Sequence, residues 1–81
     1  MESRLGLLAE LLNDRLSDEQ RQWFKEFLDA GEYGIALEML ADWLCEDDQR
    51  VTVAERAEAE RLAQAMGNVE RVMGPLALCP E

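Results

Sequence analysis

The sequence contains no histidine, only two cysteines and no long apolar run. Histidine is the side chain that most often exchanges protons near neutral pH, so its absence removes the usual general acid or base. A structural zinc site needs four ligands, which two cysteines cannot supply, and we expect neither a metal nor a cofactor. A membrane span needs about 20 apolar residues, so we expect no membrane contact.

The two cysteines, Cys45 and Cys79, could form one disulfide. The N-terminus does not resemble a secretory signal, because Glu2 stands where a positively charged segment belongs. We therefore expect reduced cysteines and a cytoplasmic location. Neither the thiols nor the serines have a histidine to activate them as nucleophiles, and we expect no enzymatic activity.

The chain of 81 residues is long enough for one domain and too short for two. Its composition, 48% hydrophobic and 32% charged, is typical of a folded domain. The apolar residues follow helical spacing, and no stretch alternates as a strand does. We therefore expect a single all-α domain over residues 1–81, a compact bundle of four helices with a short fifth turn at its C-terminus.

The helix boundaries follow from capping signals. Four helices are expected, at about residues 3–14, 18–30, 33–46 and 53–66, and the third could begin at either Glu32 or Tyr33. Ser17 followed by Gln20, and Thr52 followed by Glu55, have the capping-box spacing that satisfies two backbone N–H groups at a helix start. Gly31 suits the left-handed residue that closes the second helix, and Gly67 should stop the fourth.

Two helices should supply much of the core. The first carries a leucine stripe with two more leucines beside it: Leu5, Leu8, Leu12, Leu7 and Leu11. The second should point four side chains inward: Trp23, Phe24, Phe27 and Leu28. Asn68 could cap the short fifth turn, which Gly74 and Pro75 would end after Met73. Residues 74–81 are then expected to form a loose tail.

Eighteen acidic residues against eight basic ones give a formal net charge of −10. Such a chain repels phosphate backbones at long range, so we do not expect nucleic acid as a ligand. The excess is concentrated, because residues 26–60 hold eleven acidic and only two basic residues.

An acidic row, Glu38, Asp42 and Glu46, recurs at every fourth position of the third helix. This spacing costs about 0.2 to 0.5 kcal/mol per like-charged pair, so folding gains nothing from it. Two interpretations stay open: a solvated face that keeps the protein soluble, or a surface that binds a basic partner.

An apolar row, Ile35, Met39 and Trp43, lies beside the acidic row. With its neighbours it widens the apolar arc of the third helix to about 200°. A broad arc usually means a central, buried helix. Alternatively, Met39 or Trp43 at the rim, among carboxylates, would anchor a basic partner.

The segment 31–40, Gly-Glu-Tyr-Gly-Ile-Ala-Leu-Glu-Met-Leu, followed by Asp42 and Leu44, resembles the GEYGLALE-L-D-L signature of the MafI-type immunity proteins. These are small helical proteins of bacterial toxin-immunity and contact-dependent growth inhibition systems. The start of the second helix at Ser17, the acidic patch near Asp47 and the end of the fourth helix at Gly67 agree with that family in outline. The resemblance covers about residues 5–67.

The resemblance implies a cytoplasmic, non-catalytic inhibitor that binds the nuclease domain of a cognate toxin one-to-one. In the members considered, that domain is an EndoU-type endoribonuclease. An RNase must expose a basic RNA-binding surface, which an acidic helix complements. The candidate partner-binding residues are Glu32, Tyr33, Glu38, Met39, Asp42, Trp43, Glu46, Asp47 and Asp48.

Two alternatives stay open. The chain could be an immunity protein for a different toxin class, such as a DNase. It could also be a homo-oligomeric helical adaptor whose apolar row pairs with the same row of a second copy. An assay on RNA and DNA separates the first alternative, and the mass in solution separates the second.

Overall fold

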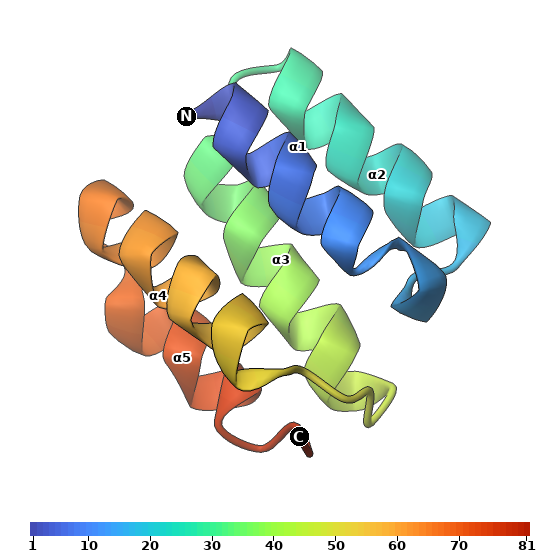
Figure 1. The fold of residues 1–81 in the computed structure, drawn as a ribbon. Helices are drawn as coiled ribbons and strands as arrows, with labels where there is room; N and C mark the ends of the chain where they lie inside the picture. Colours follow the sequence, from blue (N-terminus) through green and yellow to red (C-terminus); the bar gives the residue numbers. More distant parts are fainter.

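The computed structural model describes residues 1–81, which form five α-helices and one 3₁₀ turn. The elements are α1 (Glu2–Leu11), the 3₁₀ turn η1 (Asn13–Arg15), α2 (Asp18–Asp29), α3 (Tyr33–Glu46), α4 (Val53–Met66) and α5 (Val69–Leu76). Helix α3 lies in the middle, between α1 and α2 on one side and α4 and α5 on the other (Figure 1). The predicted all-α class is confirmed. None of the helices is both long and apolar enough to cross a membrane.

Both predicted capping boxes are present. The Ser17 hydroxyl accepts the N–H of Gln20 at 3.1 Å, and the N–H of Ser17 donates to the Gln20 side chain at 2.9 Å. Thr52 and Glu55 make the same pair of bonds at 3.1 and 2.9 Å. Gly67 has a φ of 76°, the left-handed conformation that ends α4. Short-range signals therefore fix the start of α2 and both ends of α4.

One apolar core joins all five helices. Its members are Leu5, Leu8, Leu12, Leu16, Phe24, Ala36, Leu37, Leu40, Ala41, Leu44, Val51, Ala59, Leu62, Ala63, Val72, Leu76 and Cys79. The hollow inside this core measures only about 10 Å³, roughly the smallest space that holds one water molecule. Any binding site must therefore lie on the surface.

Helix α1 is shorter than expected. It ends at Leu11, and the chain continues as η1 rather than as a helix to residue 14. Leu5 and Leu8 are buried, whereas Leu7 is 62% exposed and Leu11 is 58% exposed. Only the side of α1 that faces α3 and α4 is covered, so the two leucines beside the main stripe remain at the surface.

The expectation that Trp23 belongs to the core is wrong. Phe24 is buried, whereas Trp23 is 50% exposed and Phe27 and Leu28 are partly buried. Helix α2 packs mainly on α3, which covers the centre of its apolar arc. Trp23 lies at one edge of that arc and remains half in solvent.

The C-terminal residues depart most from the expected fold. Gly74 and Pro75 do not end the last helix, which continues through both to Leu76. Residues 74–81 are therefore not a loose tail. Pro75 removes one backbone hydrogen bond, but Leu76 and Cys79 are buried in the core and offset that loss.

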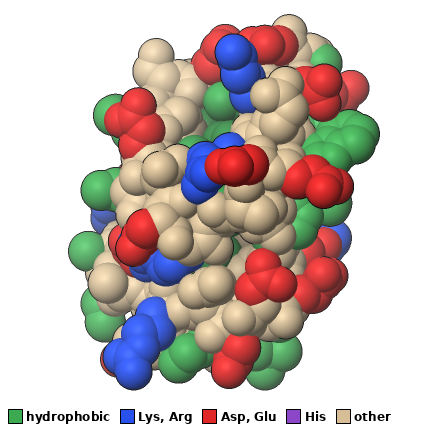
Figure 2. Space-filling model, turned by 90° about the vertical axis from the view of Figure 1, so that its right-hand side faces the viewer, with side chains coloured by type: hydrophobic (Ala, Val, Ile, Leu, Met, Phe, Trp, Pro, Cys, Tyr) green, Lys and Arg blue, Asp and Glu red, His purple; other side chains and the backbone are tan.

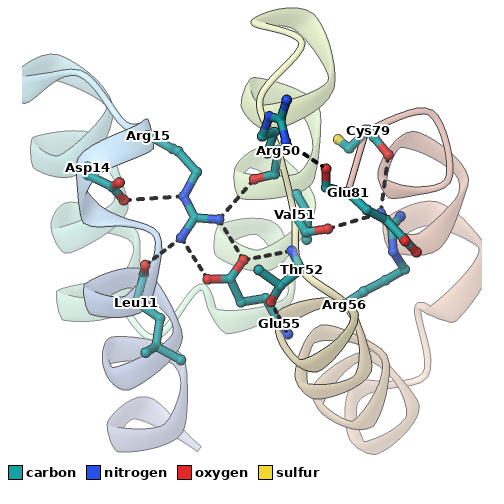
Figure 3. Close-up of polar contacts among 10 residues, drawn as sticks. All are labelled: Leu11, Asp14, Arg15, Arg50, Val51, Thr52, Glu55, Arg56, Cys79 and Glu81. Atoms are coloured by element: carbon teal, nitrogen blue, oxygen red, sulfur yellow. Dashed lines mark hydrogen bonds and ion pairs between the residues drawn. The ribbon is translucent and has the colours of Figure 1, made fainter.

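Polar contacts also hold the C-terminal residues in place (Figure 3). The Arg56 guanidinium donates to the carbonyl oxygens of Leu76 and Cys79. The N–H of Val51 donates to the carbonyl oxygen of Pro80 at 2.8 Å. The last residues thereby close over the start of α4.

A largely buried ion pair connects η1 to the start of α4 (Figure 3). Arg15 donates to both carboxylate oxygens of Glu55 at 2.5 and 2.6 Å. Further hydrogen bonds from the guanidinium reach the carbonyl oxygens of Leu11 and Arg50, at 2.8 and 2.9 Å, and the exposed carboxylate of Asp14, at 3.2 Å. The hydrogen bond from Arg15, followed by that from the N–H of Thr52, lowers the pKa of Glu55 below its usual value despite burial. The two partners are 40 residues apart in the sequence.

Candidate protein-binding groove

An open groove of about 470 Å³ runs between α2 and α3. Helix α2 supplies one wall, where the rings of Trp23 and Phe27 lie 6.1 Å apart and are tilted by 31°. Helix α3 supplies the other wall with Met39 and Trp43. The groove forms because α2 covers only one edge of α3, so the outer side chains of both helices meet in solvent. Its volume lies within the range of about 300 to 1,000 Å³ usual for ligand sites.

The polar residues of the groove gather toward the start of α2. Ser17, Glu19 and Gln20 line it there. The Gln20 side-chain amide donates to one carboxylate oxygen of Asp47 at 3.1 Å. This bond places the Asp47 carboxylate beside the groove. The apolar walls therefore adjoin two carboxylates, those of Glu19 and Asp47.

No basic side chain offsets these carboxylates. The lining of the groove contains no Lys or Arg. Neither Glu19 nor Asp47 lies within 4.0 Å of a basic group. On the face drawn in Figure 2, acidic side chains are spread widely and adjoin hydrophobic ones along the right-hand edge. A ligand entering the groove meets apolar surface and unpaired negative charge together.

A second hollow, between α1 and α2, has a different character. It measures about 330 Å³, and its lining includes Arg21 and Lys25, two of the eight basic residues. Positions two before and two after Trp23 lie roughly 160° around the helix from it. Helix α2 therefore turns its cations away from the groove that Trp23 lines.

The acidic row does not face solvent as a unit. Arg71 of α5 donates to both oxygens of Asp42 at 2.9 and 2.7 Å and lies 3.9 Å from Glu38. The hydrogen bonds with Asp42 raise the pKa of Arg71. Only Glu46, the third member, is exposed and unpaired. Two of the three predicted contacts are therefore already occupied from within the fold.

Asn68 adds to this internal pairing instead of capping α5. Its side-chain amide donates to Glu38 at 3.1 Å and to the carbonyl oxygen of Gly34 at 3.3 Å. The predicted side-chain cap is absent, because the amide is turned toward α3. The side-chain oxygen of Asn68, Oδ1, is buried without a hydrogen-bond partner.

Glu32 and Tyr33 lie at the opposite end of α3 from Asp47. The helix between them has 14 residues, so its ends are about 20 Å apart at 1.5 Å per residue. The Tyr33 hydroxyl donates to Glu2 at 3.3 Å, and the charge of Glu2 raises the pKa of Tyr33. Tyr33 thus connects α3 to α1, and neither Glu32 nor Tyr33 lines the groove.

The predicted site residues therefore form three groups. Met39 and Trp43 line the groove, with Asp47 beside it and Glu46 and Asp48 exposed at the adjacent end of α3. Glu38 and Asp42 face α5. Glu32 and Tyr33 lie at the far end. Only the first group is available to a ligand of the groove.

Sequence reasoning missed Glu19, Trp23 and Phe27 as groove residues. These three repeat at every fourth position, so they share one row of α2. A row that starts with an acidic residue and continues with aromatic ones indicates a partly exposed edge of the helix. The sequence therefore contains a signal for this wall of the groove. The bond from Gln20 to Asp47 could not be predicted, because it joins residues 27 positions apart.

The cysteines and the acidic side chains outside the groove do not form a second candidate site. Both cysteines are free, and burial raises the pKa of the Cys79 thiol, which makes it a poor nucleophile. No three His, Cys, Asp or Glu side chains come together in a geometry that could hold a metal ion.

Comparisons with protein families, with curated proteins and with solved structures give no match.

Proposed function

We propose that this chain is an immunity protein that binds the nuclease domain of a cognate bacterial toxin in the cytoplasm and neutralises it without catalysis. The toxin domain is an EndoU-type endoribonuclease in this proposal. Three observations support it: the resemblance of residues 31–44 to the MafI-type signature, the net charge of −10, and the groove between α2 and α3.

The groove carries the proposal. Trp23, Met39 and Trp43 keep apolar surface open to solvent, although burying it would stabilise the protein by about 25 cal/mol per Å². Aromatic residues and Met are enriched at the centres of protein interfaces. Unpaired carboxylates beside such a centre favour a basic partner and speed its association. A nuclease surface is basic because it binds a polyanion.

Glu38 and Asp42 both pair with Arg71, so other acidic residues are more available to bind a partner. A partner would have to displace Arg71 before it could use either carboxylate. Glu19, Glu46, Asp47 and Asp48 have no basic partner in the fold. We therefore assign the electrostatic part of recognition to these four residues.

The test uses the C-terminal domain encoded by the adjacent upstream reading frame. The purified domain is incubated with RNA and, separately, with DNA, with and without this protein. We expect RNA cleavage to fall to background at one molar equivalent. Cleavage that persists in a stable excess contradicts the proposal, and so does a neighbouring frame that encodes no nuclease-like domain. Cleavage and inhibition on DNA alone would favour the DNase alternative.

A second candidate, the homo-oligomeric adaptor, rests on the apolar row. Ile35 is 44% exposed, and Met39 and Trp43 continue the row into the groove. Such a surface could pair with a second copy. Sedimentation of the free protein decides: one protomer is expected for the immunity function, and a dimer that Trp43→Ala dissociates would favour the adaptor.

A further inference from the structure

The α2–α3 groove has three properties that together suit one kind of side chain. It presents aromatic rings, it adjoins carboxylates, and it contains no cation of its own. A planar guanidinium stacks on aromatic rings and donates two parallel hydrogen bonds to a carboxylate. Arginine is the only side chain that can both stack on the rings through a planar face and supply the missing positive charge.

We propose that the groove receives an arginine from the protein partner, which lies against Trp23 and Trp43 and donates to Asp47 and Glu19. This inference rests on the proposed function, since it names the partner chemistry at the same site. Only one oxygen of Asp47 is engaged by Gln20, so the other remains free to accept from the guanidinium.

The two sides of α3 differ in a way that supports this assignment. On the side facing α5, the chain supplies its own arginine: Arg71 binds Asp42 through two hydrogen bonds. On the side facing α2, Asp47 has no arginine, although aromatic rings are already in position. The groove therefore offers a carboxylate that lacks the arginine partner that Arg71 provides for Asp42.

Other occupants fit less well. An apolar side chain would fill the groove but leave Glu19 and Asp47 partly desolvated without a cation, which is unfavourable. An acidic side chain would be repelled by the same carboxylates. A lysine supplies the charge but lacks the planar face that stacks on the two tryptophans.

The experiment exploits the fact that the chain has only two tryptophans. Their indole N–H groups should give two NMR signals, which Trp23→Phe would assign. The probes are a short capped peptide with two arginines flanking a leucine and its citrulline twin, in which each guanidinium is replaced by a neutral group of the same shape. We expect both indole signals to shift saturably with the arginine peptide and the citrulline peptide to bind at least tenfold more weakly.

Variants locate the binding. Asp47→Asn and Trp23→Ala should each weaken the arginine peptide several-fold. Glu60→Gln, an exposed position on α4 without an ion pair, should change nothing. Trp23 is half exposed, so its removal leaves a folded protein, which circular dichroism verifies.

Three results would overturn the inference. The indole signals do not move, or the citrulline peptide binds as tightly as the arginine peptide. Alternatively, the free protein sediments as a dimer that Trp23→Ala dissociates, which would assign the groove to a second copy.

The toxin assay keeps the two proposals apart. Suppose that Trp23→Ala and Asp47→Asn inhibit the nuclease as well as the wild type does and that the arginine peptide does not bind in the groove. This inference then fails, and the immunity function stands. If the peptide binds but no nuclease is inhibited, the immunity function fails.

Discussion

Trp23 and Phe24 are neighbours in the chain and lie in opposite environments. Phe24 is 3% exposed, whereas Trp23 is half exposed and rests on Phe27. Sequence pattern alone assigned both to the core, because a helical arc does not say how much of its edge the next helix covers. The width of α2's contact with α3 decides that. The half-buried tryptophan is the residue on which the binding proposal most depends.

Truncating these two residues should separate stability from binding. Phe24→Ala should lower the free energy of unfolding by about 3 to 5 kcal/mol, because it empties a packed core position. Trp23→Ala should cost about 1 kcal/mol or less, since half of the ring already contacts water. Urea unfolding at neutral pH measures both. Equal losses would show that Trp23 is a core residue after all.

The pair formed by Arg15 and Glu55 should matter for stability and not for binding. Glu55 is only 8% exposed, and Glu55→Gln leaves Arg15 with only the exposed Asp14 as a charge partner. We expect a loss of about 3 kcal/mol in the free energy of unfolding at pH 7. Glu60→Gln, on the exposed side of the same helix, is the matched control and should cost less than about 0.5 kcal/mol.

The same pair gives a pH dependence with a definite sign. Folding lowers the pKa of Glu55, so its contribution is fully present above the unfolded value of about 4.3. It is lost as the pH falls through the lower, folded value. The difference in unfolding free energy between the wild type and Glu55→Gln should therefore shrink below about pH 4. A difference that is constant from pH 7 to pH 3 would contradict the pairing.

Among the elements, those with a capping box were predicted closely and α5 was not. Ser17 with Gln20 and Thr52 with Glu55 act over three residues, so the sequence contains the whole signal. Helix α5 depends instead on tertiary contacts. Leu76 packs into the core and Arg56 binds its carbonyl oxygen, which carries the helix past Gly74 and Pro75. No local rule contains that information.

Two glycines should respond in opposite directions to alanine. Gly67 ends α4 with a φ of 76°, so Gly67→Ala should destabilise the protein by about 1 kcal/mol. Gly6 lies inside α1, and a Cβ added there would meet no atom outside its own turn of the helix within 4 Å. Gly6→Ala should therefore stabilise it by roughly 0.5 to 1 kcal/mol. Thermal unfolding of both variants gives the signs, and a destabilised Gly6→Ala would mean that α1 is not helical at that position.

At the scale of the whole molecule, the charge is distributed less simply than the sequence suggested. The net charge of −10 follows directly from the sequence, but the sequence does not show which carboxylates lack a basic partner. The pairing of Asp42 with Arg71 joins residues 29 positions apart, and that of Arg15 with Glu55 joins residues 40 apart. Such contacts depend on how the helices pack. The sequence therefore predicted the acidic surface and one wall of the groove, Met39 and Trp43, but not the wall from α2.

Charge reversal should slow association with the nuclease domain only at the proposed surface. Glu46, Asp47 and Asp48 changed together to Lys should lower the association rate constant roughly tenfold at low salt, and less at 0.5 M salt, where charges are screened. The matched control reverses Glu10, Glu60 and Glu70, three exposed residues on other helices without ion pairs. Equal slowing by both triples would mean that net charge alone steers the partner.

The most direct test of the groove as the interface is hydroxyl-radical footprinting of the complex with the nuclease domain. Trp and Met side chains oxidise readily where solvent reaches them, and Trp23, Met39 and Trp43 line the groove. These three side chains should lose most of their reactivity in the complex, while the exposed Met1 keeps its own. If Trp23 and Met39 oxidise as fast in the complex as in the free protein, and Leu7 and Leu11 become protected instead, the partner binds at α1 and not in the groove.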